Sequence, residues 1–439
     1  MSEQHIEPVN DSFSAVQHIP KTEFESVKFS LPPSKSHMIR LLALAAINQG
    51  TTKLRFDGII GQDIDSMIES LRSLGVNISF SKDNNSKFVT VSGVGSDGFK
   101  IHDTRINCGN SGTALRIIMG LIASMDQPVM IIGDESLSSR DNDSIIKSLC
   151  DSNVSVERIS ENNLPIVIHG PWFDGNSEDR VIAIDSSKSS QPLTSWMIAS
   201  ALFPCNVKLE VVGETVSNRH YQLTKDLCNE FGANINSLED GFLINKWNVN
   251  FPENYFVPGD ASMASFAILL TKIHNCQVNL ENWPEFNDAL GNEMLQKRTA
   301  SLGISWENNI IRNRNSGKYS SYDLTNCNDL ITPLTVILAL SNGGEISGIS
   351  HTVFKESNRI EKTIELMDCF GLKATLSDQK ILVEGGQKPK SPESSVNCHN
   401  DHRIFMSAAI LMTKFGGDLI GKGLHSIADS EFLTRLGIE

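Results

Sequence analysis

Cations and a hydroxyl group gather at the start of an apolar stretch near the N-terminus. The segment LPPSKSHMIRLLALAA carries Lys35, Ser36 and Arg40 around a predicted helix start. Such a start attracts anions, because its free backbone N–H groups and its dipole favour negative charge. The group could therefore hold a phosphate or a carboxylate, although lysine and arginine at this spacing describe a solvated surface equally well.

Two further predicted helix starts carry residues suited to an anionic ligand. In NCGNSGTALR, Gly112 would let a ligand approach the backbone closely, but the string is also an ordinary turn. In SSKSSQPLTSW, Ser189, Ser190 and Gln191 precede Pro192, which is a favourable first residue of a helix. Hydroxyl groups there could bind phosphate oxygens, whereas Ser-rich segments are most often plain loops.

Acids and arginines in the second half of the chain suggest proton transfer and carboxylate binding. Asp329 precedes the apolar stretch LITPLTVILAL, where an acid is most often a helix N-cap and less often a proton acceptor. FKESNRIEK contains Lys355, Glu356 and Arg359, and Arg403 precedes the apolar run IFMSAAILM. Residues from such distant segments can act together only if the fold brings their helix starts to one place.

The composition argues against several other classes of protein. The chain has 439 residues, a formal net charge of -14 and eight cysteines. This acidity disfavours binding to nucleic acid or to an anionic membrane, since both need a basic face. The cysteines show no CxxC or zinc-finger spacing, no apolar run could span a membrane, and the polar N-terminus resembles neither a signal nor a transit peptide. We therefore expect a cytoplasmic protein of two domains.

An internal repeat predicts how the helix starts are positioned. One series of amphipathic helices ends each time in a turn residue, at intervals of 66 to 79 residues: Gly75, Asn153, Gly232, Gly303, Gly371 and Gly437. A second series, rich in small apolar residues, begins at a similar spacing near Lys35, Thr113, Ser190, Asp260, Asp329 and Asp401. Short β-like runs join them, so six α/β units are predicted.

Eight strings resemble segments of the shikimate-pathway enolpyruvyl transferases, the EPSP synthases or 3-phosphoshikimate 1-carboxyvinyltransferases. In chain order they are PSKSHMIR, GNSGTALR, GDESLSSR, SSQPLTS, GDASMAS, DLITPLTVILAL, KESNRI and NDHRIFM. The resemblance implies two similar α/β domains, each of three βαβαββ units in an inside-out α/β barrel, with the active site in the interdomain cleft. It places residues 34–257 in the first domain and residues 1–33 with 258–439 in the second, with chain crossings near Pro33 and Pro258.

The resemblance also implies the substrates, phosphoenolpyruvate and 3-phosphoshikimate, and a monomer without metal or organic cofactor. The residues implied to hold phosphoshikimate are Lys35, Ser36, Arg40, Ser189, Ser190, Ser217, Asp329 and Lys355. Those implied to hold phosphoenolpyruvate are Lys35, Gly112, Arg140, Gln191, Arg359 and Arg403. In the implied reaction Asp329 accepts the proton of the attacking hydroxyl, and Glu356 or Lys35 protonates the enol carbon.

Several positions depart from the family pattern. Ile427 stands where the family has a lysine near phosphoenolpyruvate, with Lys422 as the next candidate cation. His220, followed by Tyr221, stands for a tyrosine beside the shikimate ring, and His351 stands for an asparagine facing the substrate. Two alternatives follow: a relative that acts on another cyclitol-type acceptor, and a catalytically silent homologue that binds anions. The nucleotide-sugar branch is disfavoured, since the chain has PSKS at the GAKN position and no cysteine in GDESLSSRDND.

Overall fold

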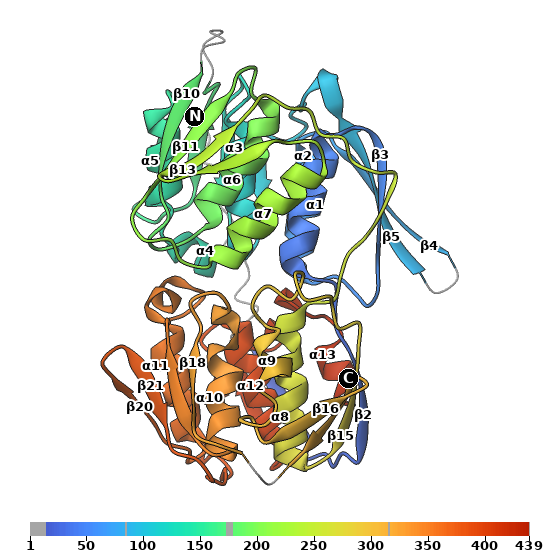
Figure 1. Cartoon of the computed structure of the whole chain (residues 1–439), viewed down its shortest axis with the longest axis vertical. Helices are drawn as coiled ribbons and strands as arrows, with labels where there is room; N and C mark the ends of the chain where they lie inside the picture. The colour runs from blue at the N-terminus through green and yellow to red at the C-terminus, as the bar shows by residue number, and fades with distance from the viewer. Residues whose placement is uncertain (1–14, 84–85, 173–178, 315–316, 439) are drawn as a thin grey trace, which may run out of the picture.

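The computed structural model describes the chain at residues 15–83, 86–172, 179–314 and 317–438. The N-terminal residues 1–14, which the sequence assigns to the second domain, lie outside this part. Helices and strands form two lobes, one above the other along the longest axis (Figure 1). In the described ranges, no helix is long and apolar enough to cross a membrane.

Each lobe has its own hydrophobic core. The core of the first lobe takes its residues from 38–257 and, from much later in the chain, Leu290. The core of the second lobe takes its residues from 19–31 and 263–436. The described part of the chain thus starts in the second lobe, builds the first lobe, and then returns to the second.

Both lobes are built from one recurring unit, β–α–β–α–β–β. Its first two strands are parallel, and its last two form an antiparallel hairpin whose final strand pairs with the second. Three units follow the chain without interruption. The second unit contains β6 (Arg105–Asn107), α3 (Gly112–Ile122), β7 (Val129–Ile132), a short α4 (Glu135–Ser139), α5 (Asp143–Asp151), β8 (Ser155–Arg158) and β9 (Ile166–His169). The third contains β10 (Arg180–Asp185), α6 (Gln191–Ala199), β11 (Val207–Val212), α7 (Asn218–Glu230), β12 (Ile235–Leu238) and β13 (Gly241–Ile244). The fifth contains β18 (Ser320–Asp323), α10 (Ile331–Leu340), β19 (Gly344–Ser347), α11 (Arg359–Cys369), β20 (Ala374–Ser377) and β21 (Lys380–Val383).

The first and fourth units borrow their first strand from a distant part of the chain. In the first unit, β14 (Asn254–Phe256) pairs in parallel with β3, and the other elements are α1 (Lys35–Ile47), β3 (Gln49–Phe56), α2 (Gln62–Ser73), β4 (Asn77–Asp83) and β5 (Ser86–Val94). In the fourth, β2 (Ser26–Ser30) pairs in parallel with β15, and the other elements are α8 (Ala264–His274), β15 (Gln277–Glu281), α9 (Met294–Lys297), β16 (Ile304–Glu307) and β17 (Ile310–Asn313). Just before each crossing, the chain therefore contributes one strand to a sheet of the lobe that it is about to leave.

The sixth unit departs from the expected βαβαββ pattern. It contains β22 (Val396–Asn397), α12 (His402–Met412), β23 (Gly417–Ile420) and α13 (Phe432–Arg435). Beside β23, the place of the usual hairpin is taken by β1 (Val16–Ile19), which pairs with it in antiparallel fashion. An unpaired strand edge exposes backbone hydrogen-bonding groups, and β1 covers this one.

The two segments that connect the lobes run side by side. Pro33 forms an isolated antiparallel bridge with Gly259. The backbone N–H of Ser34 donates to the carbonyl of Pro258 at 2.8 Å. The start of α1 is thereby fixed beside the entry to the second lobe.

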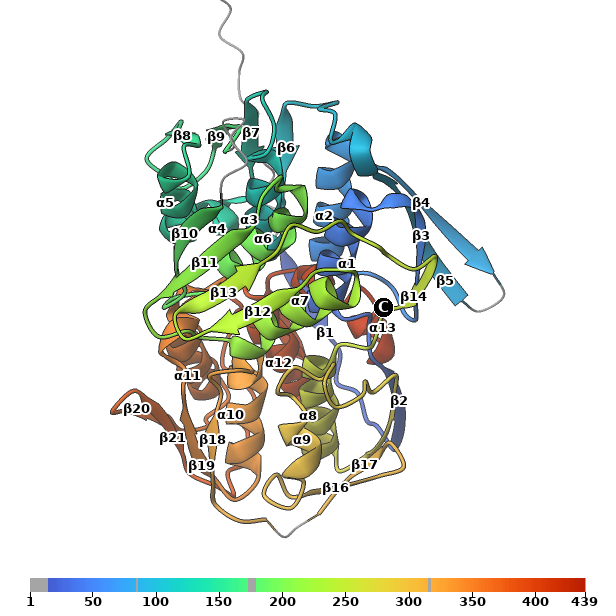
Figure 2. The same cartoon turned by 45° about the horizontal axis from the view of Figure 1, so that its top comes forward.

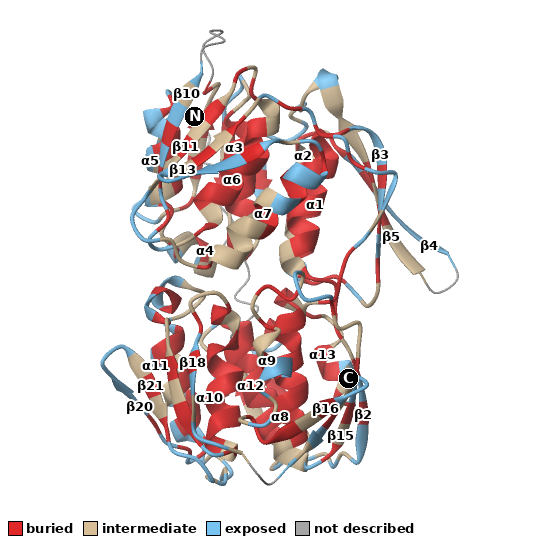
Figure 3. Ribbon diagram, viewed as in Figure 1, coloured by how far each residue is buried: buried red, intermediate tan, exposed pale blue. Residues whose placement is uncertain are grey.

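The first helix of each unit lies in the middle of its lobe. These helices are α1, α3 and α6 in the first lobe and α8, α10 and α12 in the second, and Figure 3 shows them largely buried. Their sequences are apolar on all sides, as a helix surrounded by protein requires. The sequence placed six such helix starts, and the structure confirms all six.

The second helix of each unit is followed by the turn that the repeat predicted. All six turn residues have a left-handed backbone, with φ between 64° and 111°: Gly75, Asn153, Gly232, Gly303, Gly371 and Gly437. After each one, the next backbone N–H reaches a carbonyl five residues earlier, as from Val76 to Leu71 at 3.1 Å and from Leu372 to Met367 at 2.9 Å. This is the Schellman arrangement, which satisfies the last carbonyls of a helix.

Candidate active site

One cavity lies between the lobes and is lined by residues from both. Most of the residues expected to bind substrate line it: Lys35, Ser36, Arg40, Gly112, Arg140, Ser189, Ser190, Gln191, Ser217, Asp329, Lys355 and Glu356. The remaining two, Arg359 and Arg403, lie directly behind this wall and bond to Asp329. The fold therefore brings together fourteen residues that the sequence scatters over five of the six units.

Asp329 lies between two buried guanidinium groups. Its carboxylate accepts a hydrogen bond from Arg359 Nη1 at 2.8 Å and another from Arg403 Nη2 at 3.1 Å. Burial alone favours the neutral acid, but Arg403, Arg359 and two lysines hold the pKa of Asp329 well below its ordinary value. The interpretation of Asp329 as a helix N-cap is wrong, because α10 has no side-chain cap and the carboxylate turns to the arginines.

Arg359 organises three carboxylates at the same place. Its Nε donates to Asp401 at 2.9 Å and its two other nitrogens donate to Asp329 and Glu356. Asp401 also accepts from the backbone N–H of Arg403 and thereby caps α12. Because Asp401 is fully buried, this guanidinium is fixed before any ligand arrives.

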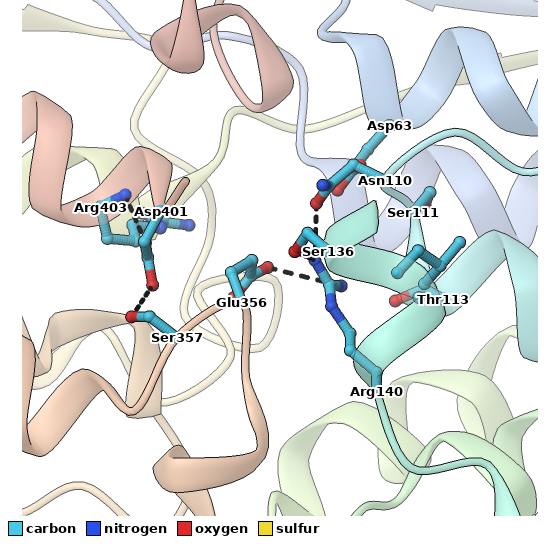
Figure 4. Close-up of polar contacts among 12 residues, drawn as sticks. Asp63, Asn110, Ser111, Thr113, Ser136, Arg140, Glu356, Ser357, Asp401 and Arg403 are labelled. Carbon is cyan, nitrogen blue, oxygen red and sulfur yellow. Dashed lines mark hydrogen bonds and ion pairs between the residues drawn. The ribbon is translucent and has the colours of Figure 1, made fainter. Parts of the chain in front are cut away.

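Glu356 reaches from the second lobe toward the first. Figure 4 shows it pointing at Arg140, and Oε1 of Glu356 lies 3.8 Å from Arg140 Nη1. Burial favours the neutral acid, yet Arg359 and Arg140 hold the pKa of Glu356 well below its ordinary value. Arg140 is oriented by Asn110, which accepts from its Nη2 at 2.6 Å. An anion bound at Arg140 would take the place that Glu356 now holds.

A cradle of polar groups surrounds Gly112 at the start of α3. A methyl group on this glycine would lie 2.7 Å from Arg116 Nη1 and 3.2 Å from Arg140 Nη1. Arg116 donates to the side-chain oxygen of Gln191 at 2.6 Å, and Gln191 donates to Thr113 at 2.9 Å. The sequence reading missed Arg116. Its position four residues after Gly112 was a usable signal, since helical side chains lean toward the preceding turn.

Lys35 and Arg40, on α1, have different surroundings. Lys35 pairs with Asp63 at 2.8 Å. Burial lowers its pKa but is outweighed by Asp63, Asp329 and Glu356, so the net shift is upward and Lys35 stays an ammonium ion. Arg40 uses its Nε and both terminal nitrogens within the first lobe, including 2.8 Å bonds to Thr224 and to the carbonyl of Ser36. Lys35 is thus the more available cation.

Two histidines line the cavity. Burial and nearby Arg40 lower the pKa of His220 to about 3, and burial and nearby Lys355 lower that of His351 to about 4. Both rings are therefore neutral at physiological pH. Within the described residues, Nδ1 of His220 and Nε2 of His351 have no hydrogen-bond partner. Tyr221 instead packs edge-on against Phe242, with the ring centroids 5.7 Å apart.

Ile427, which stands where the family has a lysine near phosphoenolpyruvate, is not among the residues that line the cavity. Ile427 is fully buried and belongs to the hydrophobic core of the second lobe. Lys422, the next candidate, has an exposed side chain, and its backbone N–H donates to Ala15. The short helical turn Leu424–Ile427 packs against α12, so its apolar residues fill the core. An apolar side chain therefore suits the packing at this position.

The architecture is that of the enolpyruvyl transferases. The structure aligns with EPSP synthase from Acinetobacter baumannii at a TM-score of 0.72 and 22% identity, over 96% of this chain and 97% of that one. It also aligns with the enolpyruvyl transferase NikO from Streptomyces tendae at a TM-score of 0.67 and 12% identity, over 96% of each chain. At these identities the likeness shows the shared fold.

The sequence assigns the chain within that class. The profile of the family described as EPSP synthase (3-phosphoshikimate 1-carboxyvinyltransferase) matches residues 25–430, and the chain belongs to this family. A 3-phosphoshikimate 1-carboxyvinyltransferase from Methanobrevibacter smithii is 28% identical over 93% of this chain and 95% of its own. One from Methanocaldococcus jannaschii is 25% identical over 90% and 91%.

Proposed function

We propose that this protein transfers the enolpyruvyl group of phosphoenolpyruvate to the 5-hydroxyl of 3-phosphoshikimate and releases phosphate. One observation carries the proposal: Asp329, Glu356 and Lys35 meet buried arginines from both lobes around a single cavity. Guanidinium groups bind carboxylate and phosphate by paired hydrogen bonds, and phosphoenolpyruvate brings both groups. The names of the relatives agree with this reaction.

Binding of the substrates would change the protonation of the two acids. In the ligand-free site, Arg359 and Arg403 keep Asp329 ionised, and Arg359 and Arg140 do the same for Glu356. Phosphoenolpyruvate would pair with these cations and so relieve both carboxylates of their partners. The pKa of each acid then rises toward the range in which it can exchange protons.

The proposed reaction has two steps. The acceptor hydroxyl adds to C2 of phosphoenolpyruvate and gives its proton to Asp329, while C3 gains a proton from Glu356. The tetrahedral intermediate then loses phosphate as the bond between C2 and the phosphate oxygen breaks, C3 returns its proton to Glu356 as the C2=C3 double bond re-forms, and Asp329 gives its proton to the departing phosphate. Lys35, held as an ammonium ion, would stabilise negative charge in both steps rather than donate the proton.

The hydroxyl groups on the other side of the cavity would bind the acceptor. We assign the phosphate of 3-phosphoshikimate to Ser189, Ser190 and Ser217, which line the cavity near the starts of α6 and α7. His220 and His351 would face the acceptor ring as neutral hydrogen-bonding groups. We further propose that residues 34–257, and residues 15–33 with 258–438, act as the two domains that close over these ligands.

Phosphate release by the purified protein tests the proposal. Release should require both phosphoenolpyruvate and 3-phosphoshikimate, and mass spectrometry should find one enolpyruvyl group added to the acceptor. Shikimate without its phosphate serves as the matched acceptor and should react far more slowly. Turnover with a different cyclitol but not with 3-phosphoshikimate would instead identify an altered acceptor. Binding of phosphoenolpyruvate without turnover of any acceptor would identify a silent homologue.

A further inference from the structure

Two hydrogen bonds join the start of α7, in the first lobe, to the segment that leads into Asp329, in the second. The backbone N–H of Ser217 donates to the carbonyl of Thr325 at 3.1 Å. The side-chain amide of Asn328 donates to the hydroxyl oxygen of Ser217 at 3.0 Å. Figure 2 shows α7 lying along the boundary between the lobes. Both bonds therefore cross that boundary.

Ser217 has an unusual backbone at this junction. Its φ of 55° is left-handed, a region that costs a residue with a side chain roughly 1 kcal/mol or more. A serine directly before a helix commonly caps it, but the hydroxyl of Ser217 makes no cap bond to α7. Instead the left-handed backbone directs the hydroxyl to Asn328 across the boundary.

Asn328 stands next to the proposed base. It is buried, lines the cavity and begins the short helical turn Asn328–Leu330. The carboxylate of Asp329 is held from within its own lobe by Arg359 and Arg403. Asn328, in the same lobe as Asp329, adds a contact to the opposite lobe, where its partner Ser217 is assigned above to the acceptor phosphate. The position of Asp329 thus depends on two sets of contacts. The bonds to Arg359 and Arg403 lie within its own lobe, and the bond from the neighbouring Asn328 to Ser217 forms only where the lobes meet.

Two side-chain pairs cross the same boundary without involving any residue of segment 325–329. Arg219 on α7 pairs with Glu293 at 3.3 Å, and His37 on α1 contacts Asp288 at 3.2 Å. Leu290, between these two acids, packs into the core of the first lobe. These contacts hold the lobes together without directly fixing Asp329. They provide a control that separates lobe contact from placement of the base.

We infer that Asn328 is a positioning residue that holds Asp329 in register with the acceptor-binding start of α7. This inference rests on the proposed function, since it treats Asp329 as the base and Ser217 as an acceptor ligand. Asp329 would then be correctly placed only when α7 meets the segment 325–329. Closure over the acceptor and activation of its hydroxyl would be one event.

Kinetics of Asn328 variants test the inference. Asn328→Ala should lower kcat by about 10- to 100-fold, with the KM for phosphoenolpyruvate changed by less than about threefold. Asn328→Asp keeps the size but loses the donor, so it should show the same loss if the alanine variant folds poorly. The control Glu293→Gln should keep kcat within about threefold. Near-normal kcat in both Asn328 variants, or an equal loss in the control, overturns the inference.

A double-mutant cycle tests the hydrogen bond itself. Ser217→Ala removes the acceptor of the bond, so Asn328→Ala should cost little further kcat in that background. Fully multiplicative losses would show that the two residues act separately.

Amide hydrogen exchange tests the contact without any reaction. In the substrate-free protein, Asn328→Ala should speed exchange in segments 217–220 and 325–329, and Glu293→Gln should not speed exchange in segment 325–329. Unchanged exchange in the Asn328 variant refutes the contact even if the enzyme is active. Absence of turnover in the natural protein would refute the proposed function alone, because the exchange result stands by itself.

Discussion

Replacing Asp329 by asparagine should separate its role as a base from its role as an ion-pair partner. The amide keeps the shape of the side chain and can still accept a hydrogen bond, but it has no useful basicity. Loss of a general base typically lowers kcat by about 100- to 10,000-fold, which corresponds to about 3 to 5 kcal/mol of barrier. We expect a loss in this range for Asp329→Asn with 3-phosphoshikimate as acceptor.

The structure also sets the expected cost in stability. Arg359 keeps two other carboxylates, Glu356 and Asp401. In the described part of the chain, the other hydrogen-bond partners of the Arg403 guanidinium are Ser262 and Met263, and it also lies over the ring of Phe266; none of these carries a charge. One buried guanidinium thus loses its counter-charge, which costs roughly 1 to 3 kcal/mol when an acceptor remains.

The assay combines steady-state kinetics, titration of phosphoenolpyruvate and thermal unfolding. With about 2 cal/mol/K of unfolding entropy per residue, that stability loss lowers Tm by about 1 to 3 °C. The Kd for phosphoenolpyruvate should stay the same or fall, because Asp329 no longer competes for Arg359 and Arg403.

A matched variant, Asp401→Asn, separates the loss of an ion-pair partner from the loss of the base. Asp401→Asn removes a fully buried carboxylate from the same arginine but leaves the proposed base in place. It should lower Tm at least as much and lower kcat much less. A kcat for Asp329→Asn within about threefold of the natural protein, or equal kcat losses in the two variants, would refute Asp329 as the base.

The remaining predictions concern cations, the core and acid stability. Arg359→Ala and Arg403→Ala should each weaken binding of phosphoenolpyruvate, by roughly 2 to 5 kcal/mol, and far more than binding of phosphoshikimate; equal losses by titration would contradict the separate subsites. Ile427→Lys should lower Tm by several degrees without lowering the KM for phosphoenolpyruvate, because a lysine in a fully buried position loses hydration; a lower KM would return position 427 to the ligand site. The depressed pKa values of Asp329 and Glu356 contribute stability that is complete above their unfolded values near 4 and is lost as pH falls through the folded ones. The free energy of unfolding, measured with urea, should therefore lose nothing from these groups between pH 7 and 5 and should decline below pH 4. The decline should be smaller in Asp329→Asn; parallel pH curves for the two proteins would show that Asp329 makes no such contribution.

The repeat was readable in the sequence because its signals are local. A glycine or asparagine after an amphipathic helix indicates a residue with a left-handed backbone, and the residue at each of the six predicted turns has this conformation. An apolar stretch after a polar segment indicates a buried helix and the position where it starts, as at Lys35 and Asp401. These signals depend on backbone conformation and burial over a few residues, so no tertiary structure is needed to see them.

The partner of each charged side chain could not be read in this way. Asp401 and Asp329 both precede apolar helices, yet Asp401 caps its helix and Asp329 turns to Arg359 on the second helix of its own unit and Arg403 on the first helix of the next. Ile427 seemed to replace a ligand-binding lysine, but the packing of the second lobe buries it in the core. Residue types along the chain therefore indicated the family, the repeat and the chemistry. Only the tertiary structure decided which charges meet, because a carboxylate binds the nearest cations in space and their distance along the sequence carries no such information.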